Sequence, residues 1–154
     1  LDRLIMLIQT LLNLFERDLA KLKAEVEAYA NEGDLWRVEG EIANSAGNLC
    51  LHLAGNLRHF FGAVLGGTDY VRDRDAEFAS KFVPRVTLLA EVDAAAADVK
   101  AVLAKITIED LQKTYPIEVF GHPMTTEFFL VHLATHLTYH LGQINYHRRL
   151  LAIK

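Results

Sequence analysis

The sequence has little cysteine, no long hydrophobic run and no excess of positive charge. Its one cysteine, Cys50, excludes an intramolecular disulfide. No stretch approaches the ~18 uninterrupted apolar residues that a membrane-spanning helix requires, so we expect no membrane segment. The net charge of −4 gives no overall positive field that would attract nucleic acid or anionic lipid, and we expect no nucleic-acid partner.

The start of the chain also lacks the charged, apolar and small-residue order of a secretory signal. Together with the single cysteine, this predicts a cytoplasmic protein. The chain begins at Leu1 rather than Met, so the sequence leaves open whether residues precede it. A chain of 154 residues fits one domain, spanning residues 1–154, around one hydrophobic core.

What the sequence does have is apolar residues at helical spacing. In the first segment Asp18 and Lys21 face away from a stripe made of Leu4, Leu7, Ile8, Leu11, Leu12, Phe15, Leu19 and Leu22. A second helix is predicted from a cap at Ser45 to the Gly66-Gly67 pair, and a third over residues 86–106. The pattern indicates an all-α protein.

The fourth predicted helix is capped by Thr125 or Thr126 and runs almost to the C-terminus. Gly142 within it would cost ~1 kcal/mol of helix stability, which predicts close contact with another helix or a site-lining segment. Residues 68–81 are predicted to form a long surface loop, with at most a short turn. Residues 107–123 favour an extended crossover over a helix.

Four of the seven histidines fall between His132 and His147. Each step of four along a helix turns the side chain by only about 40°, so His132, His136 and His140 share one largely apolar face. A buried imidazole nitrogen without a hydrogen-bond partner costs ~1–3 kcal/mol. Packing in an apolar core does not readily supply partners for the nitrogens of three stacked rings. A divalent metal ion resolves this, because histidines at i and i+4 can bind one ion.

A third ligand is expected from a facing helix, and the second helix offers His52. Three protein nitrogens leave a position for water or substrate, which is typical of a reactive metal rather than a closed structural one. Asn48 and Asn56 lie one turn either side of His52 and are predicted to bind a metal-bound water or to orient substrate. Taken by itself, His52 would read as a core histidine.

The remaining candidates have simpler interpretations. For His132 two interpretations stay open: a group beside the ligands, or an alternative ligand. His59 and His147 are expected either on the helix surface or at the rim of the site. His122 is interpreted as a loop residue and Cys50 as a core residue. The stretch 72–75 is interpreted as a solvated connection, with one alternative: an arginine there could fold over the site and meet an anionic substrate.

At these residues the sequence resembles the DinB-like superfamily of YfiT-like metalloenzymes. The resemblance rests on the segments LHLAGNLRHF (residues 51–60) and HLATHLTYHLGQI (residues 132–144), and its order and spacing extend over nearly the whole chain. It implies a four-helix bundle, up-down-down-up with a long crossover connection, that is usually a homodimer. It also implies a zinc or nickel site at His52, His136 and His140, with Gln143 beside it. Leu141 stands where many members have Arg.

The resemblance implies an enzyme that uses a low-molecular-weight thiol, such as bacillithiol, mycothiol or glutathione, to act on a small electrophilic molecule as an S-transferase or isomerase. One alternative is a metal-dependent hydrolase that activates water. The sequence has no Glu beside the histidine pair to act as the general base of such a hydrolase, and Glu127 lies too far upstream to be assigned that role. Another alternative is a non-catalytic binding or stress protein that the metal only stabilises.

Overall fold

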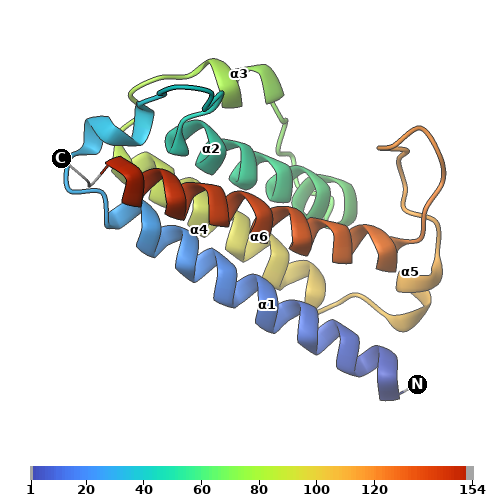
Figure 1. Ribbon diagram of the computed structural model, residues 1–154. Helices are drawn as coiled ribbons and strands as arrows, with labels where there is room; N and C mark the ends of the chain where they lie inside the picture. The colour runs from blue at the N-terminus through green and yellow to red at the C-terminus, as the bar shows by residue number, and fades with distance from the viewer. Residues whose placement is uncertain (1, 152–154) are drawn as a thin grey trace.

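The computed structural model describes residues 2–151, and the side chains of residues 6–151 (Figure 1). The predicted place of Leu4 in the first apolar stripe therefore lies outside the described side chains. In this range the chain forms six α-helices, one 3₁₀-helix and one π-helix, and no strand. The elements are α1 (Asp2–Glu27), η1 (Glu32–Trp36), α2 (Ala46–Leu57), η2 (Arg58–Leu65), α3 (Arg74–Ala79), α4 (Arg85–Leu103), α5 (Ile108–Gln112) and α6 (Thr126–Leu151). The prediction of an all-α protein is confirmed.

Four long helices lie side by side, with α1 and α2 each packed against both α4 and α6 (Figure 1). The predicted stripe of α1 supplies much of the core between them, through Leu11, Phe15, Leu19 and Leu22. Phe15 meets Phe61 of η2 edge to face, with ring centroids 5.1 Å apart. Burying each such side chain stabilises the fold by roughly 1.5–3 kcal/mol. This packing holds α2 and α6 next to each other.

Asp18 departs from its predicted place on the solvent side of α1. Its side chain is buried and accepts hydrogen bonds from Thr138 Oγ1 of α6 and from Arg17 Nε, both at 2.7 Å. A buried carboxylate is stable only with such partners. The expectation that Asp18 faces away was wrong because α6 covers that part of α1 and offers it a donor.

The predicted helix boundaries are set by the expected caps. Ser45 accepts a hydrogen bond from the backbone N–H of Asn48 at the start of α2, and Thr125 does the same for Phe128 at the start of α6. Gly66 caps η2, and Gly67 follows with a φ of +67°, a conformation that glycine adopts without strain. The second predicted helix therefore comprises α2 and its π-helical continuation η2.

Two predicted connections contain helices. Within residues 68–81, Asp73 caps α3 by accepting a hydrogen bond from Ala76 N, and α3 packs against α2. Within residues 107–123, Thr107 and Asp110 form a reciprocal capping box that starts α5. Both predictions were wrong in part, because each helix is too short to show an apolar period and depends on its cap.

The prediction for Gly142 was also wrong. No described atom outside its own helix lies within 4 Å of the place where a Cβ would stand, so no neighbouring segment requires a glycine there. No helix in residues 2–151 has both the length and the apolar character needed to cross a membrane.

Candidate metal centre

The structure brings His52 of α2 together with His136 and His140 of α6. One ligand atom from each histidine lies within 4.8 Å of the other two. The Nε2 atoms of His52 and His136 are 3.1 Å apart, and the rings of His136 and His140 have centroids 4.6 Å apart. Among the described residues, this is the one group of three metal-ligating side chains found so close together.

Neighbouring side chains orient two of the three imidazoles. Glu77 Oε2 lies 2.9 Å from His52 Nδ1, and a carboxylate can only accept, so Nδ1 carries the proton and Nε2 presents its lone pair to the cluster. Gln143 Oε1 lies 2.7 Å from His140 Nδ1 and orients that ring in the same way. Such partners fix the tautomer of metal-binding histidines. The predicted place of Gln143 beside a ligand agrees with this contact.

Glu77 is the site residue that sequence reasoning missed. Its carboxylate is only 6% exposed and also accepts hydrogen bonds from Arg72 Nε and Nη2, at 2.7 and 2.9 Å. Burial raises its pKa, but hydrogen bonds from His52 and Arg72 outweigh burial and hold the pKa below its usual value. The residue stays ionised and can orient His52. Its position on α3, in a segment predicted as loop, concealed it.

Glycine at position 55 makes room for this carboxylate. A Cβ on Gly55 would overlap Glu77 Oε1, so any larger residue at this position of α2 would push the carboxylate away from that helix. The Arg72 side chain is mostly buried against Glu77 rather than solvated, so the interpretation of residues 72–75 as a solvated connection was wrong at this position. The alternative, that an arginine of this stretch folds inward, describes Arg72, although its guanidinium is bound to Glu77.

Burial keeps the imidazoles of His136 and His140 neutral. Burial, together with the nearby His140 and His52, lowers the pKa of His136 to about 3. Burial also lowers the pKa of His140. A protonated imidazole cannot bind a cation, so both rings are in the ligating form at neutral pH.

The two asparagines predicted near the site have different surroundings. The Asn48 amide donates to the backbone carbonyls of Glu77, Phe78 and Ser80, and its oxygen accepts from Ser45 Oγ and Lys81 Nζ. It anchors the segment that carries Glu77, and these bonds occupy the whole amide. Asn56 is buried, and its Oδ1 has no hydrogen-bond partner among the described residues.

The other histidines lie outside the cluster of three. His132 stacks between Phe129 and His136, with centroid distances of 5.8 and 6.1 Å. His147 is buried, with Nδ1 2.7 Å from Tyr29 Oη and Nε2 2.8 Å from the carbonyl oxygen of Arg37. It is therefore a structural residue rather than a rim residue. His122 contacts the carbonyl of Pro123 in the crossover, as expected for a loop histidine.

The donor set fits a divalent cation such as zinc or nickel. Zinc–nitrogen bonds of about 2.0–2.1 Å at tetrahedral angles place two ligand nitrogens roughly 3.3 Å apart, close to the 3.1 Å between His52 and His136. Two of the rings already present Nε2 lone pairs to the cluster. With three protein ligands, the arrangement is that of an open site.

Comparison with known families matches residues 6–154 to the family described as "Protein of unknown function (DUF1572)". No curated protein matches the sequence. The three-histidine cluster is consistent with the resemblance to DinB-like metal-binding proteins.

Proposed function

We propose that this chain, which belongs to the DUF1572 family of proteins of unknown function, is a divalent-metal-dependent enzyme that joins a low-molecular-weight thiol to a small electrophilic molecule. S-transfer and thiol-dependent isomerisation are the two reactions of this kind. The observation that carries the proposal is the convergence of three imidazoles, from α2 and α6, within 4.8 Å.

His52, His136 and His140 would hold zinc or nickel, while Glu77 and Gln143 keep two of the rings in the ligating tautomer. Imidazole ligands carry no negative charge, so a cation held there would keep its double charge and would lower the pKa of a bound thiol, which favours the thiolate at neutral pH. In S-transfer the sulfur forms a bond to the electrophilic carbon. The leaving group departs with its electron pair, and the proton of the thiol passes to water.

The thiol must come from outside the chain. Cys50 is fully buried, and burial raises its pKa to about 12, which suppresses its thiolate at neutral pH. A free cysteine and a reduced small thiol both persist in a reducing compartment, so the proposal places the protein in the cytoplasm.

Hydrolysis has less support from the site. Metal-activated water needs a general base, and Glu77 is the buried carboxylate in contact with a cluster histidine. Both of its oxygens already accept hydrogen bonds, Oε1 from Arg72 and Oε2 from Arg72 and His52. The acid acts as an orienting group for His52 rather than as a base.

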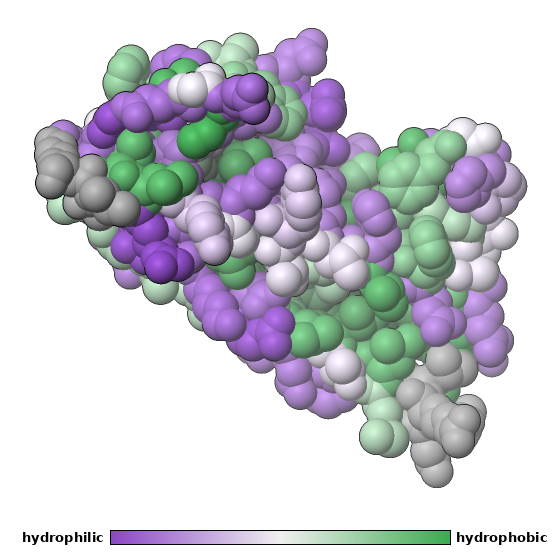
Figure 2. Space-filling view, viewed as in Figure 1, coloured by the Kyte–Doolittle hydropathy of each residue, from purple (hydrophilic) through white to green (hydrophobic). Residues whose placement is uncertain are grey.

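The finer fold assignment is part of the same proposal: a DinB-like bundle, up-down-down-up, that forms a homodimer. The packing of α1 and α2 against both α4 and α6 supports the bundle (Figure 1). Exposed apolar side chains on α6, including Phe128, Tyr139 and Tyr146, support a dimer, and Figure 2 shows hydrophobic patches between polar side chains on one face of the molecule. Sedimentation equilibrium would test the assembly, and a monomer at all concentrations would rule it out.

The enzymatic proposal is tested with protein purified without an affinity tag and loaded with zinc or nickel. Each of bacillithiol, mycothiol and glutathione is mixed with a generic electrophile, and product formation is followed by mass spectrometry. We expect turnover with at least one thiol, lost in His136→Ala and retained in His122→Ala, which removes a histidine of the crossover. No rate above the metal-free control with any thiol would count against an enzyme of this kind.

A melting experiment on the same protein separates the non-catalytic alternative. If chelation lowers the melting temperature greatly while no thiol or small acid shifts it, the cation only ties α2 to α6, and the chain is a metal-stabilised binding protein.

A further inference from the structure

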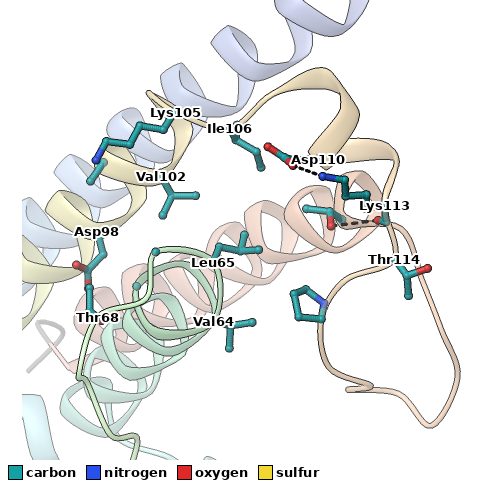
Figure 3. Close-up of a pocket in the computed structure, with 15 residues that line it drawn as sticks. Val64, Leu65, Thr68, Asp98, Val102, Lys105, Ile106, Asp110, Lys113 and Thr114 are labelled. Atoms are coloured by element: carbon teal, nitrogen blue, oxygen red, sulfur yellow. Dashed lines mark hydrogen bonds and ion pairs between the residues drawn. The ribbon is translucent and has the colours of Figure 1, made fainter.

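A cavity lies at one end of the bundle, away from the metal centre, and its lining includes none of the three cluster histidines. It has a volume of about 440 Å³ and is enclosed by η2, the end of α4, α5 and the first residue of α6 (Figure 3). Ligand pockets in proteins typically measure about 300–1,000 Å³. The space is therefore large enough for a small organic molecule.

One end of this cavity carries two polar groups with unused hydrogen-bonding capacity. Asp98 of α4 and Thr68, just after η2, lie side by side there (Figure 3). A Cβ on Gly62 would stand 2.6 Å from Asp98 Oδ2 and 3.2 Å from Thr68 Oγ1, so the bare glycine is what allows both groups to approach this point of η2. Within residues 6–151, neither side chain has a hydrogen bond to another protein group, although Arg58 Nε lies 3.8 Å from Asp98.

The charge at this end is negative and incompletely compensated. The Asp98 side chain is about one-fifth exposed, and Arg58, its cationic neighbour, donates its own close hydrogen bond to Glu91 at 2.8 Å. Burial raises the pKa of Asp98, as expected for a carboxylate that has lost water without gaining a donor. A cationic donor would restore both the lost hydrogen bonds and the charge balance.

The rest of the cavity favours an apolar body. Val64 and Leu65 of η2 face Val102 of α4 and Ile106 across the space (Figure 3). At the far end Lys113 and Asp110 are paired at 2.8 Å and so satisfy each other. The wall thus offers hydrocarbon contact between Asp98 at one end and the Asp110–Lys113 ion pair at the other, and the exposed Lys105 also lines the cavity.

We propose that this cavity is a binding site for a small amphipathic primary amine. The ammonium group donates hydrogen bonds to Asp98 and Thr68, and the aliphatic or aromatic body lies against Val64, Leu65, Val102 and Ile106. An acid of the same shape is repelled by Asp98, and an alcohol makes a hydrogen bond without neutralising the charge.

The test uses three ligands of equal length: hexylamine, hexanol and hexanoate. Each is titrated into zinc-loaded protein while the methyl resonances of Val64, Leu65, Val102 and Ile106 are followed by NMR. We expect the amine to bind at least about ten-fold more tightly than the alcohol, as a charge-assisted hydrogen bond implies, and hexanoate to bind most weakly. Equal binding of all three would overturn the proposal by showing a non-selective apolar cavity.

Two variants connect the preference to the proposed contacts. Asp98→Asn keeps the shape and removes the charge, so it should abolish the difference between amine and alcohol, and Thr68→Val at an exposed position should weaken amine binding several-fold. Lys105→Gln changes an exposed charge that lines the same cavity and should leave the preference intact. If Asp98→Asn and Thr68→Val both bind hexylamine like the unaltered protein, or if the amine perturbs only the cluster histidines through metal coordination, the proposal is wrong.

Discussion

Helix α6 carries a buried histidine, His147, and a half-buried one, His136, whose ring nitrogens have different partners. At His147 both ring nitrogens have partners within the protein, Tyr29 Oη and the carbonyl of Arg37. At His136, Nε2 lies 3.1 Å from another histidine nitrogen, and Nδ1 is buried without a hydrogen-bond partner among the described residues. The sequence places both on the same helix among apolar residues, so spacing alone does not separate them.

The difference teaches that the partners of each nitrogen distinguish a structural histidine from a candidate ligand. A satisfied imidazole contributes to the fold and has no free lone pair to offer. Three imidazoles whose lone pairs converge on one point are unfavourable when nothing lies between them, and become favourable when they surround a cation. Substitutions at the two places should therefore change different quantities.

The largest expected effect is on metal binding in His136→Ala. Loss of groups that only orient ligands lowers metal affinity by about 10–100-fold, so loss of a ligand should lower it by more than about 100-fold. Competition with a chromophoric chelator and elemental analysis measure this. Circular dichroism should show an unchanged helix content, and stoichiometric metal in the folded variant would contradict the assignment of His136 as a ligand.

A smaller loss of affinity is expected for Glu77→Gln. The amide keeps the size of the acid but not its charge, so His52 becomes a weaker donor to the metal and Arg72 loses its ion pair. We expect one metal per chain, bound about 10–100-fold more weakly in the same chelator competition.

Asp75→Asn makes the same chemical change at an exposed position of α3 and serves as the matched control. If both variants bound metal like the unaltered protein, Glu77 would have no role in orienting His52.

His147→Leu should shift stability and leave the metal centre alone. It removes the donor to the Arg37 carbonyl and leaves Tyr29 Oη with only the Ile144 carbonyl oxygen, at 3.3 Å, and buried groups that lose partners cost about 1–3 kcal/mol. Urea unfolding of the chelated protein measures the free energy of unfolding. Metal affinity, measured in parallel, should match that of the unaltered protein, and a large drop would mean that the two environments are coupled along α6.

The smallest effect is expected for Gly142→Ala, between the two environments. No described atom outside the helix crowds this position, so alanine should stabilise α6 by about 0.5–1 kcal/mol through its higher helix propensity. Gly142→Ala should leave the metal affinity unchanged. Adding His147→Leu to this variant should still lower the free energy of unfolding by the same amount. Destabilisation on this substitution would reveal a contact outside the described chain, such as a second copy packed on α6.

Much of the fold was predictable because it depends on local pattern. The apolar stripe of α1, the cap at Ser45 and the start of α6 at Thr125 all follow from the identity and spacing of neighbouring residues. The short helices α3 and α5 were missed because each consists of little more than a cap and one or two turns. Asp18 was misplaced because the donor that allows its burial lies on a distant segment.

The sequence by itself determined the helical periods, the caps and the i, i+4 spacing of His136 and His140, since these depend on geometry within a few residues. Only the tertiary structure decided which lone pairs remain free on His52 and His147: it placed Glu77 on His52, and Tyr29 with Arg37 on His147. The physical reason is that the state of an imidazole depends on donors and acceptors within about 3 Å. For His52 and His147 those atoms come from segments far away in the chain.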